Sequence, residues 1–424
     1  MVSSTTSNAS SNRPIVLGID FGTSNTAAAY IDASGALQVI QLDGAKAEMP
    51  TALFFDTENH QVLFGSQAMQ AYLAGTEGRL LRSLKSLLGS ALMNEYTAVG
   101  ERSLRYFDIV VLFFKELKRR CEAQAGHPFH HVVLGRPVHF VDDSAERDAL
   151  AQDTLGQAAQ EAGFTHIRYQ LEPIAAALDY GQRISTDTTV LVVDIGGGTS
   201  DFTVMRLHAG QSSESAHVLA TTGVHIGGTD FDRLLDLATV MPHLGYKHVG
   251  TGGRIVPSSV FFDLSTWHLI HQAYTRKALH FAKELWTDYS DQTLHHRLMT
   301  ALECQYGHRM LASVEAAKIA CSISGQPSAV DLAYLDATLP TTRIDAPGME
   351  EALHASLQQV VQCAQQCISA AGLQAVDVVY LTGGSSALRT LITTLRQAMP
   401  QATLVEGNRF GGVAAGLAWQ GVRP

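Results

Sequence analysis

The chain contains the same strand, glycine turn and strand pattern twice. One copy has the turn Asp-Phe-Gly-Thr-Ser-Asn at residues 20–25, and the other has Asp-Ile-Gly-Gly-Gly-Thr at residues 194–199. Short apolar runs precede and follow each turn and read as buried strands, at residues 15–19, 27–31, 190–193 and 202–205. A fold for this chain therefore has to accommodate two similar hairpins, about 170 residues apart in a sequence of 424.

The residues of the two turns suit phosphate binding. Glycine lets the backbone turn sharply and approach a ligand closely, while free N–H groups and nearby hydroxyls bind phosphate oxygens. Asp20 and Asp194 each end a first strand, where a carboxylate can hold a hydrated metal ion beside those phosphates. Either turn alone is equally consistent with an ordinary β-hairpin. The repetition favours a pair of phosphate-binding loops.

Composition excludes several classes of function. The formal net charge of −10 argues against a nucleic-acid or anionic-membrane partner, because both need clustered positive charge. Residues 1–13 are mostly small and polar and are expected to be a disordered tail rather than a signal peptide. The five cysteines are odd in number and irregularly spaced, which predicts reduced thiols and a cytoplasmic protein. Cys363 and Cys367 lie one helical turn apart, where packing is favoured over metal binding.

The rest of the sequence alternates strands with helices, which predicts an α/β fold. The first turn is followed by a predicted β-meander over residues 27–55, and residues 69–92 are predicted to be mostly helical. A short helix over residues 172–181 has proline just inside its start and glycine at its end. The other predicted elements are helices at 106–125, 144–162, 314–320, 349–371 and 411–420, strands at 131–135 and 377–381, and long helices after residue 266.

Further polar residues are candidates for binding or structure. Gly227 and Gly228 open a helix in a way that resembles an anion-binding helix start, and residues 382–386 form a third turn from a strand through glycines into a helix. Glu172, in the first turn of its helix, is also placed to cap the helix dipole. His268 and His271 share one helical face, but metal binding is disfavoured because no acidic or cysteine partner stands at metal-ligand spacing.

With these motifs in order, the chain resembles the superfamily of actin, sugar kinases and heat-shock ATPases. Within it, the sequence is most similar to the nucleotide-binding domain of DnaK-type heat-shock chaperones, particularly their short YegD-like relatives. The motifs follow the family order from Gly18 to Gly416. The resemblance implies an α/β fold of duplicated ribonuclease H-like domains, the actin-like ATPase fold, with two lobes around a nucleotide cleft.

The same resemblance implies domain bounds. Lobe I is expected over residues 14–187 and 408–424, and lobe II over 188–407, with a mostly helical insertion at about 231–325. The two glycine turns are expected to face each other across the cleft. No interdomain linker or peptide-binding β domain follows the last predicted helix, so we expect no peptide-binding domain. Pro137 and Arg147 resemble residues that couple nucleotide state to that domain in the family.

By resemblance, ATP or ADP with Mg²⁺ are the expected cofactors. Lys85 would reach the transferred phosphate, and Glu172 and Asp194 would orient or deprotonate the attacking water. Asp20, Asp194 and Asp201 would hold Mg²⁺ mostly through water. Glu315, Lys318 and Ser322 match the residues that contact adenosine. The remaining residues expected to contact the nucleotide are Gly22, Thr23, Ser24, Asn25, Gly196, Gly197, Gly198, Thr199, Gly227, Gly228, Gly383, Gly384 and Ser385.

Two positions depart from the family pattern, because Ile319 and Ala387 stand where the chaperones usually have arginines beside the adenine. The expected function is a slow Mg²⁺-dependent ATPase that acts as a nucleotide switch toward an unidentified protein partner or co-chaperone. Two alternatives remain open. One is a small-molecule kinase of the sugar-kinase type, although no sugar-kinase signature is present, and the other is a non-catalytic nucleotide-binding scaffold or filament protein.

Overall fold

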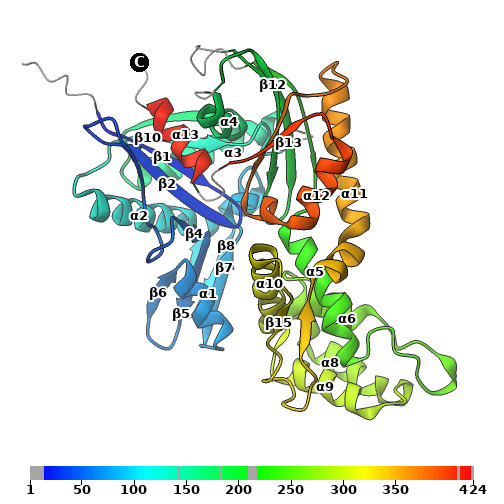
Figure 1. The fold of residues 1–424 in the computed structure, drawn as a ribbon. Coiled ribbons are helices and arrows are strands. Elements are labelled where there is room, and N and C mark those ends of the chain that lie inside the picture. The colour runs from blue at the N-terminus through cyan, green and yellow to red at the C-terminus, as the bar shows by residue number, and fades with distance from the viewer. Residues whose placement is uncertain (1–13, 142–143, 182–183, 209–216, 408–410, 422–424) are drawn as a thin grey trace, which may run out of the picture. The chain divides into compact units, whose positions relative to one another are not determined.

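The computed structural model describes residues 14–421 apart from 142–143, 182–183, 209–216 and 408–410, so the predicted tail at 1–13 lies outside the described residues. The chain divides into two compact units (Figure 1). Unit 1 comprises the described residues of Met1–Tyr72, Thr76–Tyr180 and Phe410–Pro424, and unit 2 those of Leu73–Gly75 and Gly181–Arg409. The predicted lobe boundaries stay a prediction.

Unit 1 is built on a sheet with the order β11-β10-β1-β2-β3. The central strand β1 runs antiparallel to β2 and parallel to β10, and β10 runs parallel to β11. A further strand, β4, pairs with β2. The strands are β1 (Val16–Phe21), β2 (Asn25–Ile31), β3 (Leu37–Val39), β4 (Glu48–Pro50), β10 (His131–Arg136) and β11 (His166–Leu171).

Helices cover both faces of this sheet because β1 alternates its side chains between them. Leu17, Ile19 and Phe21 pack with α2 (Tyr106–Ala125) and α3 (Ala145–Glu161). On the other face lies α13 (Gly412–Gly421), shown in red in Figure 1. A Cβ on Gly18 would lie 2.5 Å from the backbone nitrogen of Ala418, so only glycine lets this helix pack so closely. Asp20 lies two residues beyond Gly18 and therefore points to the α13 face.

The helix α4 (Glu172–Gly181) packs against α13 through small residues. A Cβ on Gly416 would lie 2.0 Å from the carbonyl oxygen of Ala175, and the consecutive residues Ala175, Ala176 and Ala177 are fully buried. The close approach anchors the first turn of α4, which carries Glu172, to the Asp20 face of the sheet.

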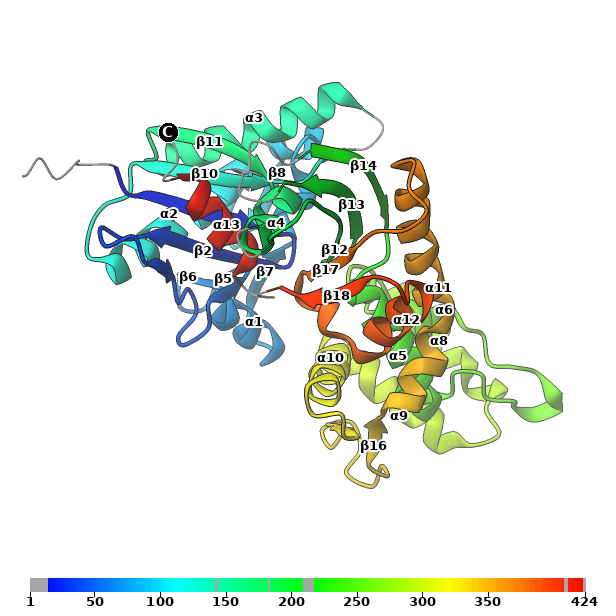
Figure 2. The same ribbon diagram turned by 45° about the horizontal axis from the view of Figure 1, so that its top comes forward.

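Unit 2 repeats the topology of unit 1. Its sheet has the order β14-β13-β12-β17-β18, with β12 antiparallel to β13 and parallel to β17 (Figure 2). The strands are β12 (Thr188–Ile195), β13 (Ser200–Leu207), β14 (His217–Val224), β17 (Val378–Thr382) and β18 (Thr403–Glu406). Strand order and direction correspond one to one with β1, β2, β3, β10 and β11. The predicted α/β class with duplicated domains is confirmed, and the duplication covers whole sheets rather than hairpins alone.

One face of the second sheet packs against helices of the same unit, and Leu191, Val193 and Phe202 lie in this core. The helices are α5 (Gly228–Thr239), α10 (Gly307–Ser324), α11 (Ala346–Ala370) and α12 (Arg389–Ala398). The stretch predicted as a mostly helical insertion, about residues 231–325, begins within α5 and ends just after α10, whose 18 residues match the long helices predicted after residue 266. The helices between α5 and α10 are short. They are α6 (Ser259–Ser265), α7 (Ile270–Ala273), α8 (Arg276–Glu284) and α9 (Gln292–Glu303), and a small β15 (Ser328–Val330) and β16 (Thr342–Ile344) ribbon follows α10.

Two predictions in unit 1 were wrong. Residues 69–92 are not mostly helical, because after α1 (Ser66–Leu73) the chain forms β7 (Gly78–Arg82) and two short 3₁₀ turns, Leu84–Leu87 and Ala91–Asn94. The predicted meander also breaks, because β5 (Ala52–Asp56) joins a separate sheet with β6 (Gln61–Phe64) and β7. A hairpin of β8 (Tyr96–Val99) and β9 (Arg102–Arg105) precedes α2. Pairing with β5, rather than local helix propensity, decides the conformation of residues 78–82.

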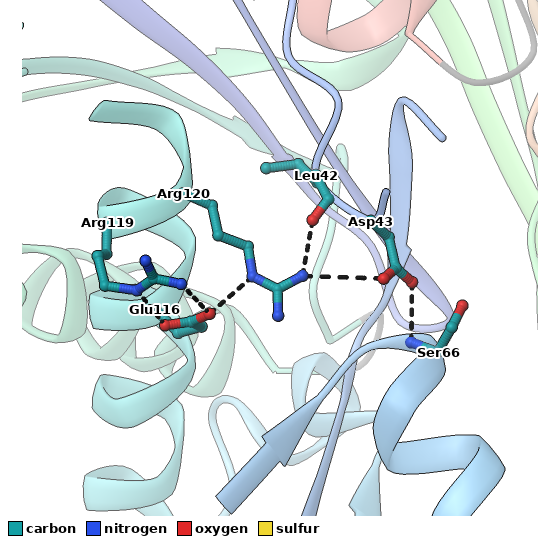
Figure 3. Close-up of polar contacts among 6 residues, drawn as sticks. All are labelled: Leu42, Asp43, Ser66, Glu116, Arg119 and Arg120. Carbon is teal, nitrogen blue, oxygen red and sulfur yellow. Dashed lines mark hydrogen bonds and ion pairs between the residues drawn. The ribbon is translucent and has the colours of Figure 1, made fainter. Parts of the chain in front are cut away.

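A polar network connects the start of α1, which follows β6, to α2 through residues 42 and 43 (Figure 3). Asp43 accepts a hydrogen bond from the backbone N–H of Ser66 at 2.8 Å, which caps the start of α1 from a distant part of the chain. Arg120 of α2 donates to the carbonyl of Leu42 at 2.7 Å and lies 3.8 Å from the Asp43 carboxylate. Glu116 bonds both Arg119 and Arg120 and so fixes the direction of the second guanidinium.

No helix among the described residues is both long and apolar enough to cross a membrane. All five cysteines are free thiols, and all except Cys304 are buried. Cys363 and Cys367 pack inside unit 2, where their sulfur atoms lie 3.4 Å from the Thr222 hydroxyl and the Phe202 carbonyl respectively. In the part of the chain that the structure describes, no three or more His, Cys, Asp or Glu side chains lie together as metal ligands would, and His268 and His271 therefore belong to no such group.

We predict that Asp43→Ala lowers the free energy of unfolding by about 1–3 kcal/mol, because the N–H of Ser66 and the Arg120 guanidinium lose a common acceptor. Asp43→Asn keeps one oxygen acceptor and should lose less. Urea unfolding measures both variants, with Glu101→Ala, at an exposed position between β8 and β9, as the control. Equal stability of Asp43→Ala and the control would contradict this role for Asp43.

Candidate functional site

The first predicted loop is the turn between β1 and β2 in unit 1, and Thr51 holds it from outside. The Thr51 hydroxyl donates to the carbonyl of Gly22 at 2.8 Å, and its backbone N–H donates to the carbonyl of Ser24 at 2.8 Å. A Cβ on Gly22 would lie 2.3 Å from the carbonyl oxygen of Asn25, so the turn requires glycine there. Thr23 and Ser24 are half-buried, and Asn25 is exposed at the start of β2.

Beside this loop, unit 1 brings three predicted site residues together. Lys85 Nζ lies 2.7 Å from Glu172 Oε1, and both side chains are nearly buried. The charges of Glu172 and Lys85 both act on the pKa of Asp20. Burial raises the pKa of its carboxyl, the neighbouring Glu172 raises it further and Lys85 lowers it, which leaves the pKa at about 7. Burial is the largest of these causes, so the Asp20 carboxyl holds its proton more readily than an exposed aspartate does.

A second carboxylate lies near Asp20. In the ladder, Asp20 of β1 pairs with Ala27 of β2, and Ala27 pairs with Glu48 of β4, so Asp20 and Glu48 lie on one face with a small alanine between them. Burial raises the pKa of Glu48 to about 7, against the lowering effect of Lys46. The charge of Glu48 also raises the pKa of Asp20.

Local backbone features place Lys85 and Glu172. Lys85 lies in a 3₁₀ turn that follows Ser83, whose left-handed conformation (φ of 58°) is rare for serine and strains the chain. Glu172 starts α4 directly where β11 ends. Gly135 of β10 leaves room for it, because a Cβ there would lie 3.0 Å from Glu172 Cγ. The ion pair therefore depends on a strained turn and on a glycine in the neighbouring strand.

In unit 2 the second predicted loop, residues 196–199 between β12 and β13, lies against two other predicted segments. The carbonyl of Gly196 accepts from the N–H of Gly228 and from the hydroxyl of Ser385, both at 3.0 Å. The carbonyl of Gly197 accepts from the N–H and from the hydroxyl of Thr229, both at 2.7 Å. The structure thus brings the turn, the α5 start and the third glycine turn together.

These segments touch so closely that a side chain at any of three glycine positions would collide with a neighbouring segment. A Cβ on Gly227 would lie 2.6 Å from the Gly198 nitrogen, and a Cβ on Gly228 would lie 2.4 Å from the Ser385 hydroxyl. Gly383 has a φ of 82°, and a Cβ there would lie 2.4 Å from Asp194 Oδ1. By contrast, a Cβ on Gly198 or Gly384 would meet no atom within 4 Å, so open space adjoins the loop at these two glycines.

The predicted acidic residues of unit 2 lie at the same end of the sheet. Asp194 of β12 and Asp201 of β13 are cross-strand partners on either side of the loop. Thr199 donates to Asp201 Oδ2 at 2.9 Å. Asp194 is half-buried, while Asp201 and Thr199 are exposed. This set of carboxylates beside backbone N–H groups and hydroxyls suits a hydrated Mg²⁺ and a phosphate chain.

The predicted adenosine contacts come from α10. Lys318 is buried and forms a 2.7 Å ion pair with Asp232 of α5, which joins α10 to the helix that starts at Gly228. The Ser322 hydroxyl is buried without a hydrogen-bond partner among the described residues. Because buried hydroxyls are normally hydrogen-bonded, this one is available to a polar group of a ligand. Glu315 is exposed, as is Ile319 with 47% of its surface accessible. Arg389 bonds the carbonyls of Ser322 and Ile323 at the end of α10.

The site residues predicted from the sequence therefore form two groups, one in each unit. Unit 1 groups Asp20, Lys85 and Glu172 beside the first loop, and unit 2 groups the second loop with Gly227, Gly228 and the turn at 383–385. The expectation that the two loops face each other stays a prediction, as do the roles assigned to the residues. Thr51, Glu48, Thr229 and Gly135 were missed. Thr51 and Thr229 stand 29 and 32 residues along the chain from the glycines that they contact, so no local pattern marks them.

The chain has recognisable relatives. Residues 16–241 match the family model described as Hsp70 protein. The chaperone protein DnaK of Thermotoga petrophila is 31% identical over 227 residues, which are 53% of this chain and 35% of that protein. The DnaK of Thermotoga maritima matches with the same figures, and that of Thermosipho melanesiensis is 31% identical over 231 residues, covering 54% of this chain and 36% of the relative. The matched stretch thus spans about a third of each relative.

We predict that the pKa of Asp20, followed by carbon-13 NMR of its carboxyl, is near 7 and moves in opposite directions in two variants. Glu172→Gln removes a negative neighbour and should lower the pKa, whereas Lys85→Met removes the positive one and should raise it. Glu48→Gln should lower it as well. Since protonated Asp20 predominates below the pKa, the folded protein takes up a proton as pH falls through 7. A titration near the usual value for aspartate would contradict the burial argument.

Proposed function

The chain belongs to the Hsp70 family, and from that premise we propose that it binds ATP and ADP with Mg²⁺ and hydrolyses ATP slowly. The observation that carries the proposal is the meeting in unit 2 of the loop 196–199, the α5 start and the turn at 383–385. The Lys85–Glu172 pair beside the Asp20 loop in unit 1 supports it. Both groups offer backbone N–H donors and hydroxyls for phosphate oxygens and carboxylates for a hydrated metal, and the unit 1 group adds the Lys85 cation. These are the kinds of contact that a triphosphate with Mg²⁺ needs.

In the proposed reaction the protein supplies charge neutralisation and orientation, which phosphoryl transfer mainly requires. Bound Mg²⁺ would neutralise phosphate charge, held mostly through water by Asp20, Asp194 and Asp201. Lys85 would leave Glu172 and donate to the γ-phosphate, where negative charge develops in the transition state. Glu172 Oε1 would then be free to accept a proton from the attacking water, which Asp194 helps to orient.

We further propose that the ATP and ADP states differ in conformation and that an unidentified protein partner or co-chaperone responds to the difference. Family membership is the support for this switch. The cytoplasmic location stays a prediction from the number and spacing of the cysteines. Adenine recognition would rest on Ser322 and Lys318, because Ile319 and Ala387 offer no cation to stack on the base.

We predict that the purified protein hydrolyses ATP without added substrate and that Lys85→Ala and Asp194→Asn each slow hydrolysis at least about 100-fold. Release of phosphate is measured in single turnover with Mg²⁺, alone and with a panel of sugars, and ATP binding is measured separately by calorimetry. Two control variants, Lys115→Ala on α2 and Asp153→Asn on α3, remove the same side-chain charges at exposed positions outside both groups. Neither should change the rate of ATP hydrolysis or the affinity for ATP.

The outcomes separate the candidate functions. Turnover that depends on a sugar would replace the switch with a small-molecule kinase. Tight ATP binding without turnover would leave a nucleotide-binding scaffold, which sedimentation with ATP would test for filaments. Absence of ATP binding would overturn the proposal entirely.

A further inference from the structure

Both glycine loops are held by a threonine that lies outside the loop and uses the same chemistry. Thr51 lies between β4 and β5, whereas Thr229 lies in the first turn of α5, so the two residues come from unrelated elements of two separate units. Each donates its hydroxyl to a glycine carbonyl of the loop, Thr51 to Gly22 at 2.8 Å and Thr229 to Gly197 at 2.7 Å. Each also donates its backbone N–H to a loop carbonyl.

The hydroxyl of Thr51 is held in turn by a second buried hydroxyl. Thr26 Oγ1 lies 2.8 Å from Thr51 Oγ1, and both residues are buried. Because Thr51 gives its only hydroxyl proton to Gly22, Thr26 must donate to Thr51. The chain of bonds therefore runs in one direction, from Thr26 to Thr51 to the Gly22 carbonyl, and leaves no freedom in the orientation of the Thr51 hydroxyl.

A hydrogen bond that fixes the direction of a loop carbonyl also fixes the direction of the N–H group in the same peptide unit. The peptide unit is planar and trans, so the N–H of a residue points opposite to the carbonyl of the residue before it. When the carbonyl of Gly22 points toward Thr51, the N–H of Thr23 points the other way. When the carbonyl of Gly197 points toward Thr229, the N–H of Gly198 points away from the Thr229 hydroxyl. A Cβ on Gly198 would meet no atom within 4 Å, so there is room for a ligand beside this residue.

Without such bonds, each glycine peptide could rotate, because glycine adopts positive and negative φ with similar ease. An amide that turns away presents a carbonyl dipole of the wrong sign to an anion. We therefore propose that Thr51 and Thr229 are positioning residues that aim the N–H groups of Thr23 and Gly198 at the phosphates of the nucleotide. This proposal rests on the proposed ATP binding. It states that the hydroxyls of Thr51 and Thr229 determine the direction in which the two N–H groups point.

The expected effects differ between the two sites. Thr51→Val removes the hydroxyl donor to the Gly22 carbonyl and should weaken ATP binding about 10-fold, near the upper end of one net hydrogen bond. Thr229→Val leaves the backbone N–H of residue 229 on the Gly197 carbonyl, so the loss should be about 3-fold. Thr51→Ser and Thr229→Ser keep the donor and should restore the affinity.

The test compares ATP with adenosine, which lacks phosphates, by calorimetry on the full chain with Mg²⁺. The valine variants should lose affinity for ATP and keep that for adenosine within about 2-fold, because only phosphate donors are misaligned. Thr154→Val on α3 and Thr394→Val on α12 are matched controls, since each removes a hydroxyl that donates to a backbone carbonyl, at 2.7 and 2.8 Å, outside both loops.

If the wild-type protein binds no ATP, the proposed function fails. If the wild type binds ATP and the valine variants bind it equally well, or lose ATP and adenosine alike, the positioning role is overturned while ATP binding stands. A second measurement does not depend on the variants folding. In the wild-type protein the amide resonances of Thr23 and Gly198 should shift on addition of ATP and not of adenosine, and unchanged resonances would also overturn the inference.

Discussion

The structure depends on hydrogen bonds that turn the carbonyls of its glycine loops into the protein. Glycine permits the tight turns after β1 and β12, but the same freedom leaves the direction of each peptide undetermined. Thr51 settles it in unit 1, and Thr229 with Ser385 settles it in unit 2. The loops can then present N–H groups outward at the ends of two sheets, which is the arrangement that an anion requires.

Steric demands add to this constraint. At Gly227, Gly228 and Gly383 even a single methyl group would collide with the neighbouring segment, so three stretches of unit 2 that are far apart in the sequence share one small space. At Gly198 and Gly384 the added group would meet nothing. The glycines of one motif thus serve two purposes, since some allow backbone to pack on backbone and others leave room beside the loop.

Charge is distributed unevenly in unit 1. Lys85 lies near the carboxylates of Glu172 and Asp20, and a third carboxylate, that of Glu48, lies two strands from Asp20 on the far side of β2. A single buried cation does not neutralise all three, and burial therefore holds the pKa of Asp20 and of Glu48 near 7. A site in this condition gains from a further cation. That property agrees with the Mg²⁺ proposed for it.

The sequence alone determined the features that depend on neighbours along the chain. The hairpins followed from apolar runs around glycine, and the bounds of α2 and α3 followed from Gly126 in the left-handed conformation and from the Ser144 cap. Only the tertiary structure decided that residues 78–82 form a strand, since β5 supplies the hydrogen bonds, and that Lys85 meets Glu172, 87 residues away. Thr51 and Thr229 escaped sequence reasoning for the same reason. A threonine carries no local sign of which carbonyl its hydroxyl will reach, because folding alone brings the two together.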